Sequence, residues 1–292
     1  MAAHNAHLRA LITLALEEDS VDEDITTQIL IPPRKQANAT ITAKEELVIA
    51  GLGVARQVFA QVDRSLRFVE LEKDGNLVET GTACCTISGN ARSLLKAERV
   101  ALNFLQHLSG IATLTRQFCL AANTSSTKLL DTRKTTPGLR YLQKQAVTCG
   151  GGTNHRHSLK DGILIKDNHL AMLNAQGITL AQACRQAKKH APAHLKVCVE
   201  TETLEEVDAA IQGSADIILL DNMLPHLLRK ALRLIDRRAL TEISGGITLK
   251  NIHTMAKIGA DFISIGALTH SARSMDLSLS LTPLERTSRR RP

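Results

Sequence analysis

The second half of the chain repeats one pattern, and this repeat constrains the fold more than any other feature. After residue 125, short apolar runs alternate with longer segments in which apolar residues recur at helical spacing. Each run leads into a polar residue or a glycine, and the last four of these positions follow one another at 21 to 24 residues. The six run ends are Asp131, Lys166, Glu200, Asp221, Ser244-Gly245-Gly246 and Gly266. Strands that alternate with helices predict a parallel sheet.

The run ends also indicate where a site would lie. Parallel strands place their carboxyl ends at one edge, and in β/α barrels that edge carries the active site. Six strands are clear, and we expect a seventh near Ala146 to Cys149. A closed barrel needs eight strands. The sequence therefore predicts an incomplete, open β/α barrel, with a doubly wound open sheet as the alternative.

The first third of the chain follows a different pattern. Residues 37–53, 66–71 and 77–87 contain alternating apolar residues and turn signals that predict antiparallel strands. Residues 92–122 predict one long helix, which we expect Gly110 to bend or interrupt. The chain therefore contains an antiparallel α/β part followed by a parallel one.

Composition narrows the class of protein. Of the 292 residues, 43% are apolar, which is enough to bury a substantial core, and the formal net charge is +7. A basic chain could bind nucleic acid, but aromatic residues, which usually carry single-strand and RNA recognition, make up only 2%. Part of the basic excess lies in the last eight residues, where we expect a disordered end. We therefore expect no nucleic-acid partner, and non-catalytic binding of a polyanion remains the alternative.

Cysteine usage and hydropathy indicate the compartment. The six cysteines include no CxxC pair, so neither a zinc site nor a redox dithiol is expected. They are typical of reduced, mostly buried thiols in a cytosolic protein. No stretch reaches the roughly 18 apolar residues of a membrane helix, and the apolar run from Leu8 to Leu16 leads into acidic residues. The sequence predicts a cytoplasmic protein without a membrane partner.

Basic side chains concentrate between Asp131 and His169. This stretch holds seven Lys or Arg against three acids, which is +4 of the formal net charge. Because these charges are interleaved with glycine, threonine and short apolar runs, they predict a pocket for a small polyanion. Arginine supplies bidentate forks for carboxylate or phosphate, and lysine supplies point charges. The candidates are Arg133, Lys134, His155, Arg156 and Lys166.

The remaining strand ends predict complementary roles. Glu200 and Asp221 could bind Mg²⁺, hold ribose hydroxyls or stabilise a cationic transition state, with capping or ion pairing as the alternative. Ser244-Gly245-Gly246 and Ile265-Gly266-Ala267 can bring backbone N–H groups close to a phosphate, with tight turns as the alternative. The residues alone thus indicate a barrel enzyme that acts on a small phosphorylated polyanion.

Several ordered motifs resemble one enzyme family, the quinolinate phosphoribosyltransferases or carboxylating nicotinate-nucleotide pyrophosphorylases. The motifs follow the family order from about residue 17 to about residue 281. They are Glu98 to Asn103, Leu108 to Thr113, Asp131 to Thr135, Asn154 to Arg156, Lys166 to His169, Val199-Glu200, Leu220 to Asn222, Ser244 to Ile247 and Gly266 to Ser271. Glu23, where the family pattern has a glycine, and Gln145, where it has a bulky residue, depart from it.

The resemblance implies a fold and an assembly. It implies an N-terminal α/β sandwich domain over residues 1–115 and an open β/α barrel over residues 116–270. Residues 271–292 would pack back on the sandwich. It also implies a homodimer with shared active sites, with higher oligomers left open. Arg99, which by itself is most simply a solvated helix residue, would then reach the partner's site.

The resemblance also implies a reaction. Members convert quinolinate and phosphoribosyl pyrophosphate to nicotinate mononucleotide, pyrophosphate and CO₂ with Mg²⁺, in NAD biosynthesis. By resemblance, the quinolinate carboxylates are bound by Arg99, Arg133, His155 and Arg156. A related phosphoribosyltransferase, or a paralogue associated with molybdenum transport, is the alternative within enzymes. The paired carboxylate-binding groups favour quinolinate.

The same resemblance assigns the donor side of the site. Lys134 and Lys166 would lie between the two substrates and steady the departing pyrophosphate. Glu200 and Asp221 would bind ribose hydroxyls and metal and favour the cationic sugar. The substrate-binding set is completed by Thr132 and, around the 5′-phosphate, by Ser244, Gly245, Gly246, Ile265, Gly266 and Ala267.

Overall fold

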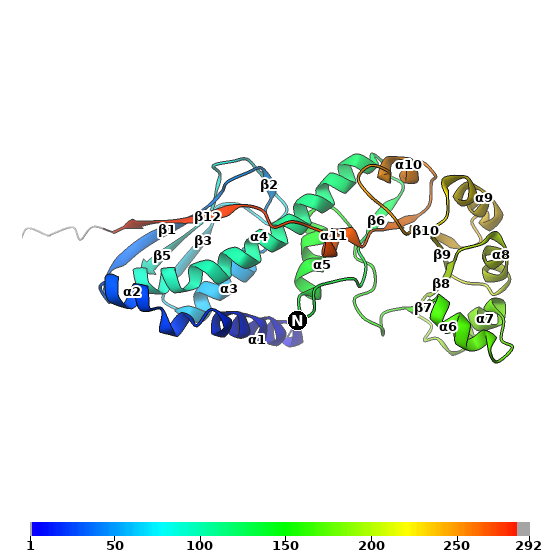
Figure 1. Cartoon of the computed structure of the whole chain (residues 1–292), viewed down its shortest axis with the longest axis horizontal. Helices are drawn as coiled ribbons and strands as arrows, with labels where there is room; N and C mark the ends of the chain where they lie inside the picture. Colours follow the sequence, from blue (N-terminus) through cyan, green and yellow to red (C-terminus); the bar gives the residue numbers. More distant parts are fainter. Residues whose placement is uncertain (1, 285–292) are drawn as a thin grey trace, which may run out of the picture. The chain divides into compact units, whose positions relative to one another are not determined.

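The computed structural model describes residues 2–284, with side chains described from residue 6 onward. These residues form two compact units (Figure 1). The first contains residues 2–113 and 272–284, and the second contains residues 114–271. The arginine-rich end, residues 285–292, lies outside the described residues, and so does the part of the expected C-terminal packing that would involve it.

Antiparallel strands form the sheet of the first unit. They are β1 (Gln36–Ala43), β2 (Leu47–Val48), β3 (Arg67–Glu70), β4 (Leu77–Val78), β5 (Ala83–Asn90) and β12 (Leu277–Pro283). The main sheet has the order β12-β1-β5-β3, and β2 pairs with β4. Side chains alternate along β1, so that Ala39 and Ile41 are fully buried while Asn38, on the other face of the same strand, is exposed. The predicted antiparallel N-terminal domain is confirmed.

Four helices belong wholly or partly to the first unit. They are α1 (Ala2–Glu18), α2 (Ile25–Leu30), α3 (Leu52–Val62) and α4 (Ala91–Ala122), with a 3₁₀ turn at Val21–Glu23. The division between the units falls within α4, after Thr113. This helix continues without interruption through Gly110, so the predicted interruption is wrong, and a bend at Gly110 stays a prediction. The glycine is needed for packing, because a β-carbon there would lie 1.9 Å from the carbonyl oxygen of Arg273.

The second unit contains a parallel sheet. Its strands are β6 (Lys128–Leu130), β7 (Ile163–Ile165), β8 (Val197–Thr201), β9 (Ile217–Asp221), β10 (Leu240–Ser244) and β11 (Phe262–Ser264). The order is β6-β11-β10-β9-β8-β7, and every neighbouring pair is parallel. Among the described residues, no pairing joins β6 to β7 and closes the sheet. The predicted open β/α barrel is therefore confirmed.

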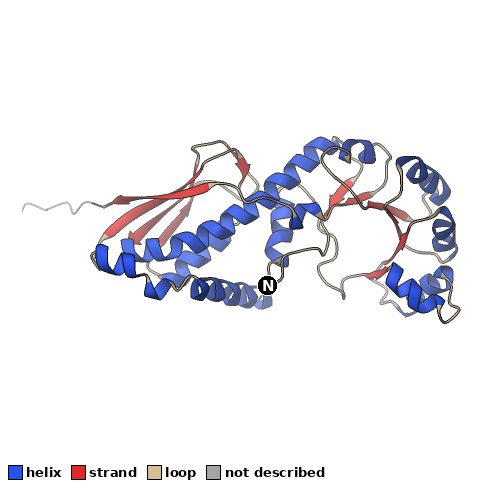
Figure 2. Cartoon of the chain, viewed as in Figure 1, coloured by secondary structure: helices blue, strands red, loops and turns tan. Residues whose placement is uncertain are grey.

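Helices follow the strands of the second unit. They are α5 (Arg140–Cys149), α6 (Asp167–Asn174), α7 (Leu180–His190), α8 (Leu204–Gln212), α9 (Pro225–Ile235), α10 (Ile252–Ala256) and α11 (Ala267–His270). Figure 2 shows α7, α8 and α9 along the convex side of the curved sheet. The predicted seventh strand at Ala146 to Cys149 is wrong, because these residues end α5. Instead, Thr153 forms an isolated parallel bridge with Leu130, beside β6.

Apolar side chains on the convex side of the sheet pack beneath the helices. The apolar strand residues at most 1% exposed on this side are Val197, Val199, Ile218, Leu220, Ile243 and Ile263. Since side chains alternate along a strand, the residues between them face the concave side. That side carries the polar and charged side chains of Glu200, Asp221, Glu242 and Ser244.

Candidate active site

Strand register places a row of charged side chains on the concave face of the sheet. Glu200 of β8 and Glu242 of β10 are both paired with Leu219 of β9, so these three side chains share one face. Two residues further along β9, Asp221 is paired with Ser244 and lies on the same face. Glu200, Asp221 and Ser244 therefore meet near the carboxyl ends of neighbouring strands, where the sequence predicted them.

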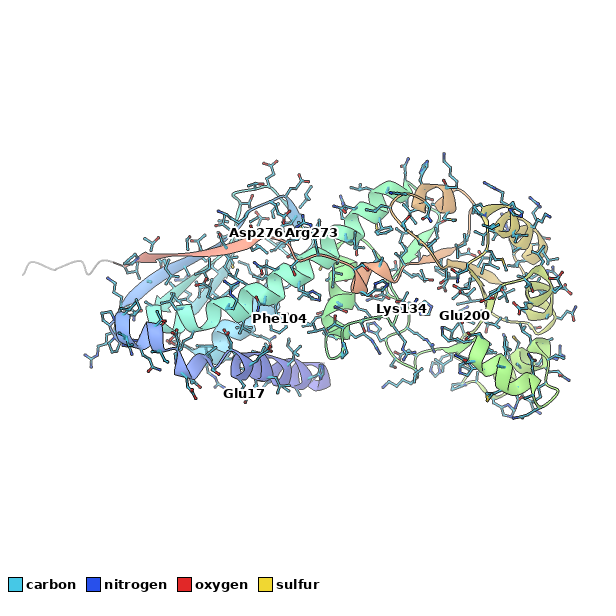
Figure 3. All side chains as sticks on the ribbon, viewed as in Figure 1. Glu17, Phe104, Lys134, Glu200, Arg273 and Asp276 are labelled. Carbon is cyan, nitrogen blue, oxygen red and sulfur yellow. The ribbon has the colours of Figure 1, made fainter. Side chains whose placement is uncertain are left out.

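Lys166 and Glu200 form an ion pair at this edge. The Lys166 ammonium lies 2.7 Å from Oε1 of Glu200, and the two side chains are 43% and 19% exposed. The backbone N–H of Lys166 donates to Nδ1 of His169 at 3.0 Å, which fixes the start of α6. The pair thus presents a cation and a carboxylate side by side where a solute can reach both (Glu200 is labelled in Figure 3).

Three basic side chains, those of Arg133, His155 and Arg156, belong to the same region. The Arg156 guanidinium donates to the carbonyl of Gly162 at 2.9 Å, and burial together with the neighbouring Arg133 lowers the pKa of Arg156. Arginine nevertheless stays charged. The backbone N–H of Arg156 donates to Nδ1 of His155 at 2.8 Å, which leaves Nε2 to carry the ring proton. Nε2 lies 3.5 Å from Oε2 of Glu242.

Two buried polar atoms in this region have no hydrogen-bond partner among the described residues. They are Nε of Arg133 and Oε1 of Glu242. Buried polar groups are seldom left unpaired in proteins, so both atoms indicate a place for polar groups of a ligand. Our reading of the sequence missed Glu242. Glu242 lies two residues before Ser244 on the same strand, so both side chains point to the same face. This spacing could have indicated that Glu242 belongs to the site.

The loop after β6 brings Lys134 to the end of β11. Thr132 accepts a hydrogen bond from the backbone N–H of Lys134 at 3.0 Å, and Thr269 of α11 donates to the carbonyl of Lys134 at 2.7 Å. The Lys134 side chain runs 3.2 Å from where a β-carbon on Gly266 would lie. Lys134, labelled in Figure 3, thereby joins the Ile265-Gly266-Ala267 segment that the sequence predicted as a phosphate site.

Glycine shapes the loop after β10. Gly245 has φ +89°, and a β-carbon there would lie 2.1 Å from Oδ1 and 2.8 Å from the backbone nitrogen of Asn222. The Asn222 amide in turn donates to Oδ2 of Asp221 at 2.7 Å, and its backbone N–H donates to the carbonyl of Ser244 at 3.0 Å. Gly246 has φ +60°, and no atom lies within 4 Å of its β-carbon position. Gly245 thus packs closely against Asn222, whereas the space beside Gly246 is open. This open space lies at the end of β10, where a ligand could approach the backbone.

Arg99 is the one predicted site residue outside the second unit. It is exposed on α4, within the first unit. All the other predicted site residues belong to the second unit, from Thr132 in the loop after β6 to Ala267 at the start of α11. Any role for Arg99 in the site therefore remains a prediction.

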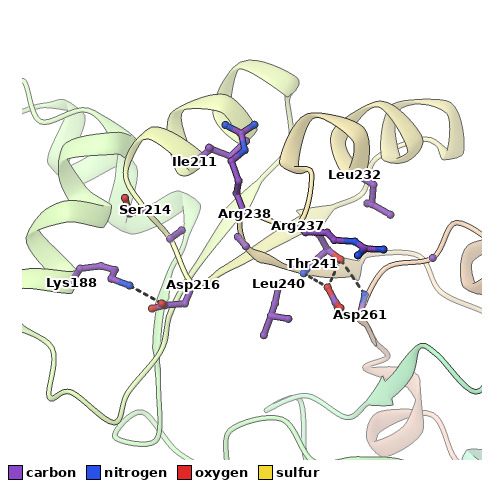
Figure 4. A pocket seen from close by; sticks show the side chains of 13 residues that line it. Lys188, Ile211, Ser214, Asp216, Leu232, Arg237, Arg238, Leu240, Thr241 and Asp261 are labelled. Carbon is purple, nitrogen blue, oxygen red and sulfur yellow. Dashed lines mark hydrogen bonds and ion pairs between the residues drawn. The ribbon is translucent and has the colours of Figure 1, made fainter.

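A cavity of about 970 Å³ lies at the opposite, amino-terminal ends of the strands (Figure 4). Lys188 and Asp216 form an ion pair of 2.6 Å at its wall, and Asp261 accepts hydrogen bonds from the backbone and hydroxyl of Thr241, each at 2.8 Å. These acids are already satisfied by protein groups. In β/α barrels this end serves stability, so we assign the cavity no catalytic role.

The described residues lack a preformed metal cluster and a membrane-spanning helix. No group of three or more His, Cys, Asp or Glu is arranged to hold a metal ion. Glu200 and Asp221 remain as two carboxylates on adjacent strands, and Mg²⁺ commonly takes one or two carboxylates together with substrate phosphates. The helices from residue 2 to residue 284 include none long and apolar enough to span a membrane.

Comparison with known families identifies the chain. The model described as the N-terminal domain of quinolinate phosphoribosyl transferase matches residues 24–109, and that of the C-terminal domain matches residues 111–280. The chain belongs to the quinolinate phosphoribosyltransferase family. The resemblance inferred from the motifs is therefore confirmed across both units.

Relatives in this family share much of the sequence and the fold. A probable carboxylating nicotinate-nucleotide pyrophosphorylase of Bacillus subtilis is 39% identical over 279 residues, covering 96% of this chain and 95% of its own length. The chloroplastic enzyme of Oryza sativa is 42% identical and covers 94% of this chain and 77% of its own length. The crystal structure of NadC from Streptococcus pyogenes is 41% identical, covers 95% of this chain and 97% of its own, and superimposes with a TM-score of 0.90.

Proposed function

We propose that this chain is a quinolinate phosphoribosyltransferase, which joins quinolinate to the ribose of phosphoribosyl pyrophosphate with loss of CO₂. The products are nicotinate mononucleotide, pyrophosphate and CO₂, and the reaction is a step of NAD biosynthesis. Family membership supports this activity. The observation that carries it is the buried, unpaired Nε of Arg133 within a group of basic side chains, because a substrate carboxylate would supply the acceptor that this N–H lacks.

Arg133, His155 and Arg156 would bind the two carboxylates of quinolinate. Guanidinium groups match carboxylates in a bidentate fashion, and the Nε2 proton of His155 adds a third donor. Like charges next to one another are costly without counter-ions, and burial beside Arg133 already lowers the pKa of Arg156. A dianionic substrate would relieve this repulsion. Such a site would prefer an acid with two adjacent carboxylates.

Phosphoribosyl pyrophosphate, the donor, would occupy the other part of the site, beside Lys134, Lys166, Glu200 and Asp221. Lys134 and Lys166 supply the charges that steady the pyrophosphate as it leaves, and Glu200 and Asp221 face the ribose hydroxyls and favour positive charge at C1. The loops at Gly245 and Gly266 would take the 5′-phosphate through backbone N–H groups. Mg²⁺ bound to the donor and to one or both carboxylates would supply further neutralisation of the pyrophosphate.

The reaction needs positioned charge more than reactive side chains. The lone pair of the pyridine nitrogen forms the new bond to C1, while the bond from C1 to oxygen breaks and pyrophosphate departs. The bond between C2 of the pyridine ring and its carboxylate then breaks, and CO₂ leaves. The electron pair stays at this ring carbon until a proton is taken up there. The pyridinium stabilises that pair. Holding both reactants in line against fixed charges can supply much of the rate.

Turnover provides the test. The full chain, given quinolinate, phosphoribosyl pyrophosphate and Mg²⁺, should form nicotinate mononucleotide and CO₂ in equal amounts. Binding of both substrates without product would favour the non-catalytic alternative. Arg133→Ala should lower kcat/KM by ~10²-fold or more, as removal of one preorganised charge does elsewhere. Arg229→Ala, on the exposed face of α9, is the matched control and should leave kcat/KM unchanged.

We also propose a homodimer in which Arg99 completes the partner's site. Its support is that Arg99 is exposed on α4 and belongs to the unit that lacks the other predicted groups. Arg99→Ala and Glu200→Ala proteins, each inactive alone, should regain part of the activity when mixed, since one hybrid site recovers both residues. No recovery after verified subunit exchange would argue against shared sites.

A cytoplasmic location is part of the same proposal. Cys84, Cys85, Cys184 and Cys198 are free thiols, and all four are buried. Reduced thiols are typical of proteins from a reducing compartment. Fractionation of the source cells should therefore recover the enzyme with the soluble cytoplasmic proteins, and recovery with membranes or secreted material would contradict the assignment.

A further inference from the structure

Asp131 and Lys144 form an ion pair in which neither side chain has any exposure to solvent. Asp131 directly follows β6, and Lys144 lies on α5. Burial raises the pKa of Asp131 and lowers that of Lys144, so the surroundings disfavour both charges. Replacing a buried ion pair by apolar residues is often neutral or stabilising. Stability is therefore a poor explanation for this pair, and its hydrogen bonds provide a better one.

The pair holds both backbone polar groups of one residue, His155. The backbone N–H of His155 donates to Oδ1 of Asp131 at 2.8 Å, and its carbonyl accepts from the Lys144 ammonium at 2.9 Å. The Asn154 amide lies against two acceptors, so its nitrogen is assigned to the side that faces them. In this orientation it donates to Oδ2 of Asp131 at 2.7 Å and to the carbonyl of Lys144 at 2.9 Å. Residues 154 and 155 thus cannot rotate without breaking charged hydrogen bonds in a buried place.

Neighbours of Lys144 on the same face of α5 hold the other loop of the site. Gln143 accepts from the backbone N–H of Thr136 at 3.0 Å and donates to its hydroxyl at 2.9 Å. Arg140 donates to the hydroxyl of Thr135 at 2.9 Å and to the carbonyl of His157 at 3.1 Å. One helix face therefore fixes the loop that follows Asp131 and the loop that contains His155.

We propose that Asp131 and Lys144 are positioning residues for the acceptor half of the site. They fix the backbone at His155, so that its imidazole and the Arg156 guanidinium are already aimed at the quinolinate carboxylates before the substrate arrives. Preorganisation of this kind lowers the cost of binding. The inference rests on the proposed function. It concerns the acceptor side, since Asp131 and Lys144 hold the backbone of His155. The donor residue Lys134 also lies in the loop after β6, but that loop is held by Arg140 and Gln143. The other donor groups follow β7 to β11.

The test is a split between the two KM values. Lys144→Met alone would leave a buried unpaired carboxylate, so the double variant Asp131→Asn with Lys144→Met is used, which removes both charges and keeps most of the volume. Its KM for quinolinate should rise about 10-fold or more, a typical cost of losing preorganised charged contacts, while its KM for phosphoribosyl pyrophosphate stays within about 2-fold of the wild-type value. Equal rises in both constants, or no rise, would overturn the proposal.

Two further variants separate positioning from loss of stability. Leu228→Ala removes a fully buried side chain from α9, so it should lower the Tm and leave both KM values unchanged. Asn154→Ala removes the two hydrogen bonds from the Asn154 amide to Asp131 and to the carbonyl of Lys144, and it removes no charge. This variant tests positioning if the double variant does not fold. A selective rise in the quinolinate KM of Asn154→Ala supports positioning, and an unchanged value overturns it. A wild-type chain without turnover would instead refute the proposed function, and this inference with it.

Discussion

Gly110→Ala should destabilise the first unit although it places a better helix former in the middle of α4. The new β-carbon would lie 1.9 Å from the carbonyl oxygen of Arg273, 3.0 Å from its carbonyl carbon and 3.4 Å from Cα of Ser274. All three are backbone atoms, so no side-chain rotation relieves the contact. The segment from Arg273 to Ser274 must move away from the helix, and it leads directly into β12.

The magnitude follows from two opposing contributions. Alanine in place of glycine stabilises a helix interior by about 1 kcal/mol. Overpacking costs about 1–3 kcal/mol, and a 1.9 Å contact with backbone is at or beyond the upper end of that range. The net change is a loss of about 2 kcal/mol in the free energy of unfolding. At about 2–4 °C per kcal/mol, the Tm should fall by about 4–8 °C.

Circular dichroism melts and urea unfolding of the full chain would measure this loss. Gly53→Ala is the matched control, since Gly53 lies exposed in the first turn of α3 and no atom comes within 4 Å of its β-carbon position. Its unfolding free energy should rise by about 0.5 kcal/mol. If Gly110→Ala raised the Tm as Gly53→Ala does, the close approach of the Arg273 backbone would be refuted.

Two other perturbations have defined outcomes. The Arg273 guanidinium, followed by the N–H of Asp276, lowers the pKa of Glu45 to about 2 (Arg273 and Asp276 are labelled in Figure 3). A lowered folded pKa gives stability that is present above the unfolded value of 4.5 and lost as the pH falls toward 2. Glu45→Gln should thus cost about 1 kcal/mol near neutral pH, after discounting for solvent screening, and match the wild type in acid; parallel stability curves would contradict this. At the strand ends, Gly245→Ala should raise the KM for phosphoribosyl pyrophosphate about 10-fold or more, since it combines a positive φ with a clash against a neighbouring backbone, whereas Gly246→Ala should mainly lose about 1–2 kcal/mol of stability. Equal kinetic losses in the two glycine variants would argue against the steric explanation.

Much of the second unit could be predicted because its strand ends recur at a regular interval. Lys166, Glu200, Asp221 and Ser244 all follow buried apolar runs, and parallel pairing then brings them to one edge whatever the details of the helices. The pattern of an apolar run followed by a polar residue can be recognised in the sequence because all of its residues belong to one strand.

The errors arose where local pattern and tertiary contacts diverge. Ala146 to Cys149 is apolar enough for a strand, but Leu142 and Ala146 bury one helical face of α5. Gly110 weakens helix propensity, yet packing against Arg273 requires a residue without a side chain there.

Residues that support the site were harder to find. Lys144 was counted only as one of the seven basic residues of the stretch from Asp131 to His169. Its partner Asp131 is 13 positions away, and only the fold brings the two together. Glu242 was read as part of a strand, since a single carboxylate in an apolar run gives no sign of the histidine opposite it. Ion-pair partners that are distant in the sequence have no characteristic spacing, so a sequence motif cannot reveal them.

The position of β12 has a consequence for how the chain is made. β1 pairs with β5 on one side and with β12 on the other, and β12 is the last strand among residues 2–284. On the ribosome, residues 277–283 emerge only after the whole parallel sheet has been synthesised. Until then β1 is an unprotected edge, open to pairing with other nascent chains. The first unit is therefore completed only after the second unit has been synthesised, and stalled or shortened products should aggregate through the exposed edge of β1.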